Sequence, residues 1–233
     1  MRLTARLPAP PQAGPGAAES PAAAARQDAG VMRDAGELLD ATEQAIRRKV
    51  GEYCFGRDEQ SLAEVVGTLL RQRGLRLCTA ESCTGGLLGH LITQVPGSSD
   101  YYVGGWVTYS NEAKQAYLGV PGEILAQYGA VSAACALAMA RGARQHSQPP
   151  AQVAVSITGV AGPGGGSPQK PVGLVYAGLS APGTEVALEW HLQGSREDIQ
   201  LRSAKWALEM IRRWALGLPI PDRQGWLGRR AAV

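Results

Sequence analysis

The stretch LRLCTAESCTGG, residues 75–86, joins a short apolar run to the apolar, helix-like segment LLGHLITQV at residues 87–95. An apolar run that leads through a polar turn into a helical segment is the repeating unit of α/β folds. The two glycines at its end free the backbone for a tight turn and for close approach by a ligand. The stretch therefore predicts a buried strand, a turn that a ligand could approach, and a helix.

The segments on either side extend this alternation of helices and strands. Ser61 and Glu64 form a capping-box pattern that opens a helix to about Arg73. Further helices are predicted from residue 111 to about 118, from Pro121, from Ser132, and from residues 194–198 onward. Further strands are predicted near residues 101–110, 152–158, 172–180 and 185–192, the last of them half-buried and antiparallel. This order favours an α/β fold, a three-layer α/β/α arrangement with a mixed, mostly parallel central sheet.

The two ends of the chain differ in composition from its centre. Residues 1–32 are rich in alanine and proline and are predicted to be a disordered leader. Residues 33–60 have apolar positions near helical spacing and are interpreted as a helical linker. Residues 61–217 form the main domain, and residues 218–233 are predicted to be an irregular basic tail.

Composition excludes several classes of function. A net charge of +3 is too small to indicate a nucleic-acid partner, and no apolar run reaches the ~18 residues of a membrane span. The four cysteines and three histidines have neither disulfide-framework nor zinc-ligand spacing. We therefore expect a cytoplasmic protein with reduced cysteines that binds no metal and needs no cofactor.

Ser82 is a candidate nucleophile because it lies just before a helix N-terminus. Free amide groups at such a terminus attract a phosphate, a carboxylate or an oxyanion, and Gly85 and Gly86 would let that anion approach. Ser82 or Thr84 could equally be an ordinary helix cap. Cys83 could be a thiolate nucleophile or a small packed residue. Glu81 could orient a base, cap the helix or bind a substrate hydroxyl, and the pattern does not decide among these roles.

A second junction, TYSNEAK at residues 108–114, offers a base for Ser82. A lysine one turn into a helix, shielded from water, has a lowered pKa, and Lys114 could then accept a proton from a hydroxyl. Tyr109 could take part in the same proton network. The alternative is that Lys114 faces solvent and that Asn111 is a simple cap.

The third junction, SITGVAGPGGGSPQKPVG at residues 156–173, has five glycines within eight residues. It matches neither a Walker A loop nor a dinucleotide fingerprint. A loop so rich in backbone donors suits a phosphate group, although a plain connection between strands is also compatible with it. Its length exceeds what a hairpin needs, which favours a function.

Taken together, the motifs TAESCTGG, VPGSS, GGWVTYSNEAKQAYLGV, GAVS and ITGVAGPGGG…KPVG resemble the C-terminal domain family of the competence-damage-inducible protein CinA. The resemblance covers residues 61–217, and the family includes the nicotinamide-nucleotide amidohydrolases. It implies hydrolysis of the carboxamide of nicotinamide mononucleotide, a small-molecule nucleotide substrate, and a homodimer. It also implies Ser82 as nucleophile, Lys114 as base and Tyr109 as helper. The implied substrate-binding residues are Thr84, Gly85, Gly86, Thr158, Gly159, Gly162, Gly164 and Gly165.

Two departures from the family pattern leave an alternative open. Residues 40–70 resemble the stretch that joins the two halves of full-length CinA proteins, but residues 1–32 do not resemble their N-terminal half. Leu174 stands where members commonly have threonine. A non-catalytic module that binds pyridine nucleotides is therefore the alternative hypothesis. A role on DNA, suggested only by the family name, conflicts with the weak net charge.

Overall fold

The computed structural model describes residues 21–220, with side chains from Asp34 onward, and the chain divides into two compact units, Met1–Glu59 and Gln60–Val233. The first unit contains helix α1 (Pro21–Val50) and the 3-10 turn η1 (Gly51–Tyr53). Helix α1 begins inside the segment predicted to be a disordered leader. Four consecutive alanines at residues 22–25 explain this, because alanine has the highest intrinsic helix propensity. Residues 1–20 of that predicted leader lie outside the described residues.

The second unit contains the predicted alternation of helices and strands. Its helices are α2 (Leu62–Gln72), α3 (Leu87–Thr93), α4 (Asn111–Leu118), α5 (Gly122–Tyr128), α6 (Ala133–His146) and α7 (Arg196–Ala215), with a 3-10 turn η2 (Ser98–Asp100). Its strands are β1 (Leu77–Glu81), β2 (Tyr102–Val107), β3 (Val153–Gly159), β4 (Leu174–Ala181) and β5 (Thr184–His191). Most of the predicted basic tail, from residue 221, lies outside the described residues.

The five strands form one sheet in the order β2-β1-β3-β4-β5. Strands β2, β1 and β3 are parallel, whereas β4 is antiparallel to both of its neighbours. The sheet is therefore mixed, with a parallel centre, as the sequence predicts. Strand β1 lies between β2 and β3, so its residues are covered by sheet on both sides and by helices above and below.

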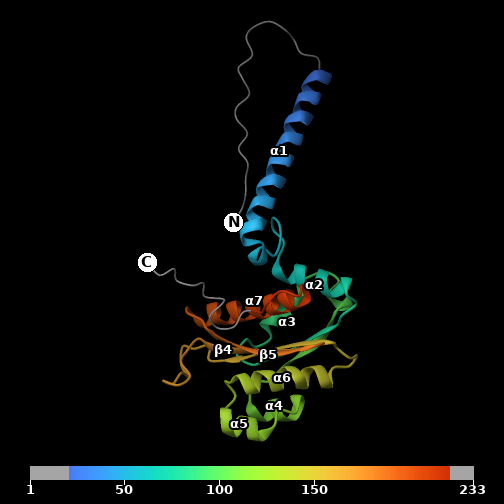
Figure 1. The fold of residues 1–233 in the computed structure, drawn as a ribbon. Coiled ribbons are helices and arrows are strands. Elements are labelled where there is room, and N and C mark those ends of the chain that lie inside the picture. Colours follow the sequence, from blue (N-terminus) through green and yellow to red (C-terminus); the bar gives the residue numbers. More distant parts are fainter. Residues whose placement is uncertain (1–20, 221–233) are drawn as a thin grey trace. The chain divides into compact units, whose positions relative to one another are not determined.

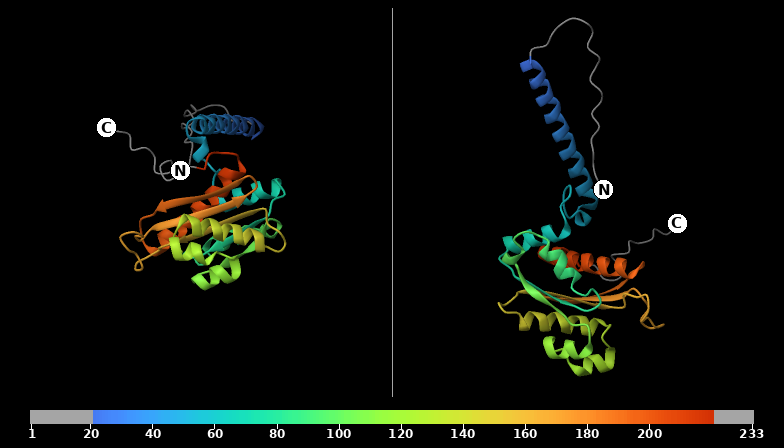
Figure 2. Two further views of the ribbon diagram at one scale, coloured as in Figure 1. Left: turned by 60° about the horizontal axis from the view of Figure 1, so that its bottom comes forward. Right: turned by 180° about the vertical axis from the view of Figure 1, so that it is seen from behind.

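Helices cover both faces of this sheet and complete three α/β/α layers (Figure 1; Figure 2). Helices α2, α3 and α7 pack on one face against apolar side chains that include Leu77, Val155 and Ile157. Helices α4, α5 and α6 pack on the other face, around Cys78 and Ala154. Strands β1 and β3 thus bury side chains on both faces, which is why their sequences read as almost unbroken apolar runs, whereas β2 lies at the edge of the sheet and is only partly buried.

Helix α4 is held against α6 by an unusually close backbone contact. A Cβ atom at Gly142 of α6 would collide with the carbonyl group of Leu118, the last residue of α4. Only glycine allows this approach. The contact fixes α4 on its face of the sheet, and α4 carries Lys114.

Candidate active site

Polar side chains gather where the three parallel strands end. Ser82 follows β1, Thr108 follows β2, and Thr158 lies near the end of β3. The register brings them together, since Glu81 pairs with Val107 on one side and with Ile157 on the other. In open α/β sheets, ligands bind outside the carboxyl ends of such strands, where the connections diverge to opposite faces. Strand β1 lies at such a point, because α3 and α4–α6 cover opposite faces.

Ser82 and Lys114 are in direct contact, as the resemblance implies. The Nζ atom of Lys114 lies 3.1 Å from the Oγ atom of Ser82. Both side chains are buried, and Lys114 is only 1% exposed. Ser110 caps the N-terminus of α4 by accepting from the amide of Ala113, which places Lys114 one turn into the helix and aims it at β1. The alternative that Lys114 faces solvent is therefore wrong.

The remaining contacts of Lys114 are backbone carbonyls. Its Nζ lies 2.8 Å from the carbonyl oxygen of Thr108 and 3.4 Å from that of Tyr109. Burial lowers the pKa of the Lys114 ammonium, and the nearby thiols of Cys135 and Cys83 together with the Glu112 carboxylate oppose this shift only partly. Within the described residues Lys114 has no ion pair. Burial therefore destabilises the ammonium form relative to the neutral amine, and Nζ lies within hydrogen-bond distance of two carbonyl oxygens and of Oγ of Ser82.

The turn after Ser82 is shaped by the buried carboxylate of Glu81. This carboxylate accepts from the amides of Gly86 (3.1 Å), Leu88 (3.0 Å) and Gly89 (2.8 Å), so it caps helix α3. The amide of Gly85 donates to the carbonyl of Ser82. Both Gly85 and Gly86 have positive φ angles, 64° and 100°, which explains glycine at these positions.

The amides that remain available for an anion are those of Cys83 and Thr84, which form no hydrogen bond to another described residue. Gly85 and Gly86 were predicted to let an anion approach the backbone, and their own amides already have partners within the protein. The hydroxyl of Thr84 is also buried without a hydrogen-bond partner, so it is available to a ligand. Burial raises the pKa of the Cys83 thiol to about 12, which removes its thiolate character near neutral pH. Cys83 is a packed residue rather than a competing nucleophile.

Tyr109 contacts Lys114 through its backbone rather than its ring. Its side chain is 64% exposed, and its hydroxyl lies 3.3 Å from Nη2 of Arg196, the first residue of α7. The other end of that guanidinium donates to the carbonyl of Gly162 at 2.8 Å. One turn later on α7, Gln200 donates to the carbonyl of Cys83 at 2.7 Å. The start of α7 thus joins the serine turn, the glycine loop and Tyr109.

Arg196 and Gln200 were missed by reasoning from sequence. A signal for Arg196 was present, since a cation in the first turn of a helix opposes the helix dipole and needs another reason to be there. Gln200 gave no such signal.

The glycine loop is anchored at both of its ends. Thr158 is buried and donates its hydroxyl proton to the carbonyl of Ala130 at 2.8 Å, which leaves its oxygen as an acceptor. Gly159 permits close contact with β4, where a Cβ atom would lie 2.7 Å from the carbonyl oxygen of Leu174. Beyond the glycines, Lys170 donates to the carbonyl of Tyr128 at 2.7 Å. Leu174, the residue that departs from the family pattern, is buried at the start of β4.

The middle of the loop is less constrained. Gly162 and Gly165 have positive φ angles of 78° and 81°, and Cβ atoms at Gly164 and Gly165 would meet nothing within 4 Å. The tip of the loop therefore has room around its backbone.

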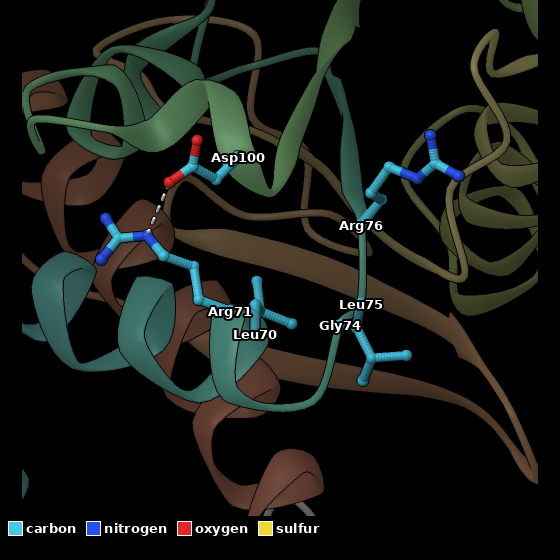
Figure 3. A pocket seen from close by; sticks show the side chains of 6 residues that line it. All are labelled: Leu70, Arg71, Gly74, Leu75, Arg76 and Asp100. Atoms are coloured by element: carbon cyan, nitrogen blue, oxygen red, sulfur yellow. Dashed lines mark ion pairs between the residues drawn. The ribbon is translucent and has the colours of Figure 1, made fainter.

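An open pocket of about 560 Å³ lies at the opposite edge of the sheet, before β1 and β2 (Figure 3). It is lined by Leu70, Arg71, Gly74, Leu75, Arg76 and Asp100. Arg71 is already engaged there, since its Nε lies 3.6 Å from the Asp100 carboxylate and its guanidinium lies over the Tyr101 ring. The pocket contains none of the residues around Ser82.

Within residues 21–220, no helix combines the length and apolarity needed to cross a bilayer. In the same part of the chain, no three side chains of histidine, cysteine, aspartate or glutamate are grouped so that they could hold a metal ion.

Comparison with known proteins identifies relatives of the second unit. The family model for the CinA C-terminal domain matches residues 59–215. A protein of Moorella thermoacetica named as competence-damage inducible is 51% identical over 169 residues, which are 72% of this chain and 40% of the relative. A CinA-like protein of Acaryochloris marina is 50% identical over 176 residues, 75% of this chain and 42% of the relative. The chain thus spans about two fifths of the length of these curated relatives.

Solved structures resemble the same unit along almost their whole length. The competence/damage inducible protein CihA of Agrobacterium tumefaciens matches with a TM-score of 0.63 and 44% identity, over 68% of this chain and 96% of that protein. A CinA superfamily protein of Klebsiella pneumoniae matches with a TM-score of 0.64 and 33% identity, over 68% of this chain and 99% of that protein. The fold and the order of its elements are therefore those of a known group of proteins.

Proposed function

The chain belongs to the CinA C-terminal domain family, and from this premise we propose that it hydrolyses the carboxamide of nicotinamide mononucleotide to nicotinate mononucleotide and ammonia. One observation carries the proposal: a buried lysine amine lies 3.1 Å from the hydroxyl of a serine at a strand-to-helix turn. A serine hydroxyl beside a neutral lysine is a recognised nucleophile–base pair for acyl transfer.

The proposed reaction has two steps. In the first, Lys114 accepts the proton of Ser82 while Oγ attacks the carboxamide carbon, and the resulting ammonium of Lys114 gives that proton to the amide nitrogen, which leaves as ammonia when the C–N bond breaks. In the second, Lys114 accepts a proton from water as the water oxygen attacks the ester carbon, and returns it to Oγ of Ser82 when the C–Oγ bond breaks; the released carboxylic acid loses its own proton to solvent and becomes the carboxylate. Each step returns Lys114 to its neutral form, which burial favours.

The amides of Cys83 and Thr84 supply hydrogen-bond donors for the negative oxygen of the tetrahedral intermediate. The loop of residues 159–166, with its open backbone at Gly164 and Gly165, supports binding of the ribose-phosphate. Thr84 has a buried hydroxyl without a hydrogen-bond partner, Thr158 directly precedes the loop, and Arg196 adds a cation that donates to the carbonyl of Gly162 within the loop. The hydrogen-bond donors and the cation complement a substrate that carries a phosphate and a carboxamide.

The test is ammonia release from nicotinamide mononucleotide by the purified wild-type chain, Ser82→Ala and Lys114→Ala. We expect turnover in the wild type and a loss of at least about 10³-fold in kcat for both variants, because either change removes the nucleophile–base pair. Cys83→Ala is the matched control and is expected to retain turnover, since the Cys83 thiol is not ionised. Thermal denaturation of every variant tests whether each is folded.

Three outcomes would count against parts of this proposal. Turnover that is lost in Cys83→Ala but retained in Ser82→Ala would assign the nucleophile to the thiol. Saturable binding of the mononucleotide without ammonia release by the folded wild type would favour the alternative, a non-catalytic nucleotide-binding module. Neither binding nor turnover would contradict the choice of substrate.

A further inference from the structure

The buried carboxylate of Glu81 has an unusual set of partners. Glu81 is 1% exposed, and its two oxygens accept from three backbone amides, those of Gly86, Leu88 and Gly89. It forms no ion pair with any described residue. The carboxylate therefore depends for its stability in the interior on the N-terminus of α3, whose free amides and dipole favour a negative charge.

The backbone of Glu81 is fixed as firmly as its side chain. Its carbonyl accepts from the amide of Thr108 at 2.8 Å, and the next amide, that of Ser82, donates to the carbonyl of Ile157 at 2.9 Å. The chain is thus tied to β2 and β3 immediately before the turn, and the Glu81 side chain ties the far end of the turn to the same residue. Only residues 83–85 lie between these two anchors.

The amides of the α3 terminus are consequently unavailable to a substrate. A helix N-terminus normally offers its first amides to an external anion. Here the protein supplies the anion itself, and the two amides that remain free, on Cys83 and Thr84, lie next to the nucleophile rather than inside the helix.

We propose that Glu81 is a positioning residue that holds the turn so that the amides of Cys83 and Thr84 face the oxyanion formed at Ser82. The proposal rests on the proposed function, because it assumes that Ser82 is an acylated nucleophile. Without the carboxylate, the first turn of α3 loses its acceptor and rotates its amides toward another one. The donors beside Ser82 then lose their alignment.

Glu81→Gln tests this with almost no change in volume. Its amide carries one acceptor oxygen and one N–H₂ donor, so at least one of the three backbone amides is left facing a donor. Glu64→Gln is the matched control. Glu64 is also a helix-capping carboxylate, which accepts from the amide of Ser61 at 2.6 Å in the capping box of α2, and it forms no hydrogen bond with the Ser82 turn.

Two measurements are made on each variant. The first is ammonia release from nicotinamide mononucleotide, resolved into kcat and KM. The second is the rate of covalent labelling by a fluorophosphonate, which needs no amide substrate. In that reaction Ser82 Oγ bonds to phosphorus, fluoride leaves with the bonding electron pair, and Lys114 accepts the proton. The phosphoryl oxygen then occupies the position of the oxyanion.

We expect Glu81→Gln to lower both kcat and the maximal labelling rate by about 10- to 100-fold, with KM nearly unchanged. Loss of a single oxyanion donor typically costs about 10²- to 10³-fold, and donors that are only misaligned should cost less. Glu64→Gln is expected to lower only the melting temperature. Glu81→Asp, which keeps the charge on a shorter side chain, is expected to give an intermediate labelling rate and serves if Glu81→Gln does not fold.

The outcomes separate this inference from the proposed function. Wild-type labelling at Ser82 without ammonia release would contradict the proposed substrate, while the labelling rates of the variants would still decide the role of Glu81. Equal labelling rates in wild type and folded Glu81→Gln would overturn the positioning role. An absence of wild-type labelling at Ser82 would overturn both.

Discussion

At the scale of single residues, the chemistry of the site follows from how Lys114 is enclosed. An exposed lysine is an ammonium ion at neutral pH and cannot accept a proton. Lys114 is buried beside two carbonyls and one hydroxyl, with no carboxylate in contact to stabilise its charge. Burial lowers the pKa of the Lys114 ammonium, and in the proposed reaction Lys114 serves Ser82 as a base without any histidine.

The lowered pKa of Lys114 predicts a pH dependence. Lys114 acts as a base only when neutral, so kcat/KM should fall as pH falls through its pKa, at a pH below the ordinary lysine value of 10.5. Measurement of kcat/KM from about pH 5 to about pH 11 checks this. Lys114→Arg keeps a cation that stays protonated throughout this range and should be inactive at every pH. A limb at or above pH 10.5 would contradict a desolvated base.

At the scale of elements, most of the second unit could be predicted because its signals are local. Ser61 with Glu64 predicts the start of α2, and both hydrogen bonds of that capping box are present. The strand predicted at residues 101–110 is shorter, Tyr102–Val107, because Ser110 caps α4 instead of extending β2. Local patterns fix where an element begins, but the competition between two neighbouring elements for one residue is decided by packing.

The functional residues were less predictable than the elements. The residues alone offered Lys114 as a possible base for Ser82 and left solvent exposure as an alternative, because 32 residues separate the two; the family resemblance favoured the pair. The role of Glu81 stayed open because a carboxylate before a helix fits several roles, and only the positions of three amides decide among them. Arg196 lies 87 residues from Tyr109, a distance that no spacing rule bridges.

The contact between α4 and α6 leads to a stability prediction. Gly142→Ala should destabilise the second unit by about 1–3 kcal/mol, because the new methyl group collides with the Leu118 carbonyl and outweighs the gain of up to about 1 kcal/mol in helix propensity. It should also lower kcat, since α4 carries Lys114. Denaturant unfolding and the ammonia assay measure both effects. Gly36→Ala in α1, where a Cβ would meet nothing within 4 Å, is the control and should leave both unchanged.

At the scale of the whole molecule, all residues of the candidate site come from one unit. The chain divides between Glu59 and Gln60, and the family match begins at residue 59. The second unit has its own sheet, two apolar cores and the complete set of site residues. It therefore has what an independently folding domain requires.

Deletion of residues 1–59 tests this independence. We expect residues 60–233 to fold cooperatively and to retain kcat/KM within about twofold, because the candidate site residues named above all lie in the second unit. Circular dichroism with thermal denaturation and the ammonia assay give the comparison with the full chain. A folded but inactive fragment would show that residues 1–59 contribute to catalysis.

The hydrogen bonds from α7 to the site also have a consequence for how the protein folds during synthesis. Arg196 and Gln200 secure the glycine loop and the serine turn from a helix that follows all five strands in the chain. During synthesis from the N-terminus, Ser82 and Lys114 leave the ribosome long before these residues do. We expect a nascent chain that ends at β5 to lack the apolar side chains with which α7 completes one face of the core, and to begin hydrolysis only once α7 has emerged.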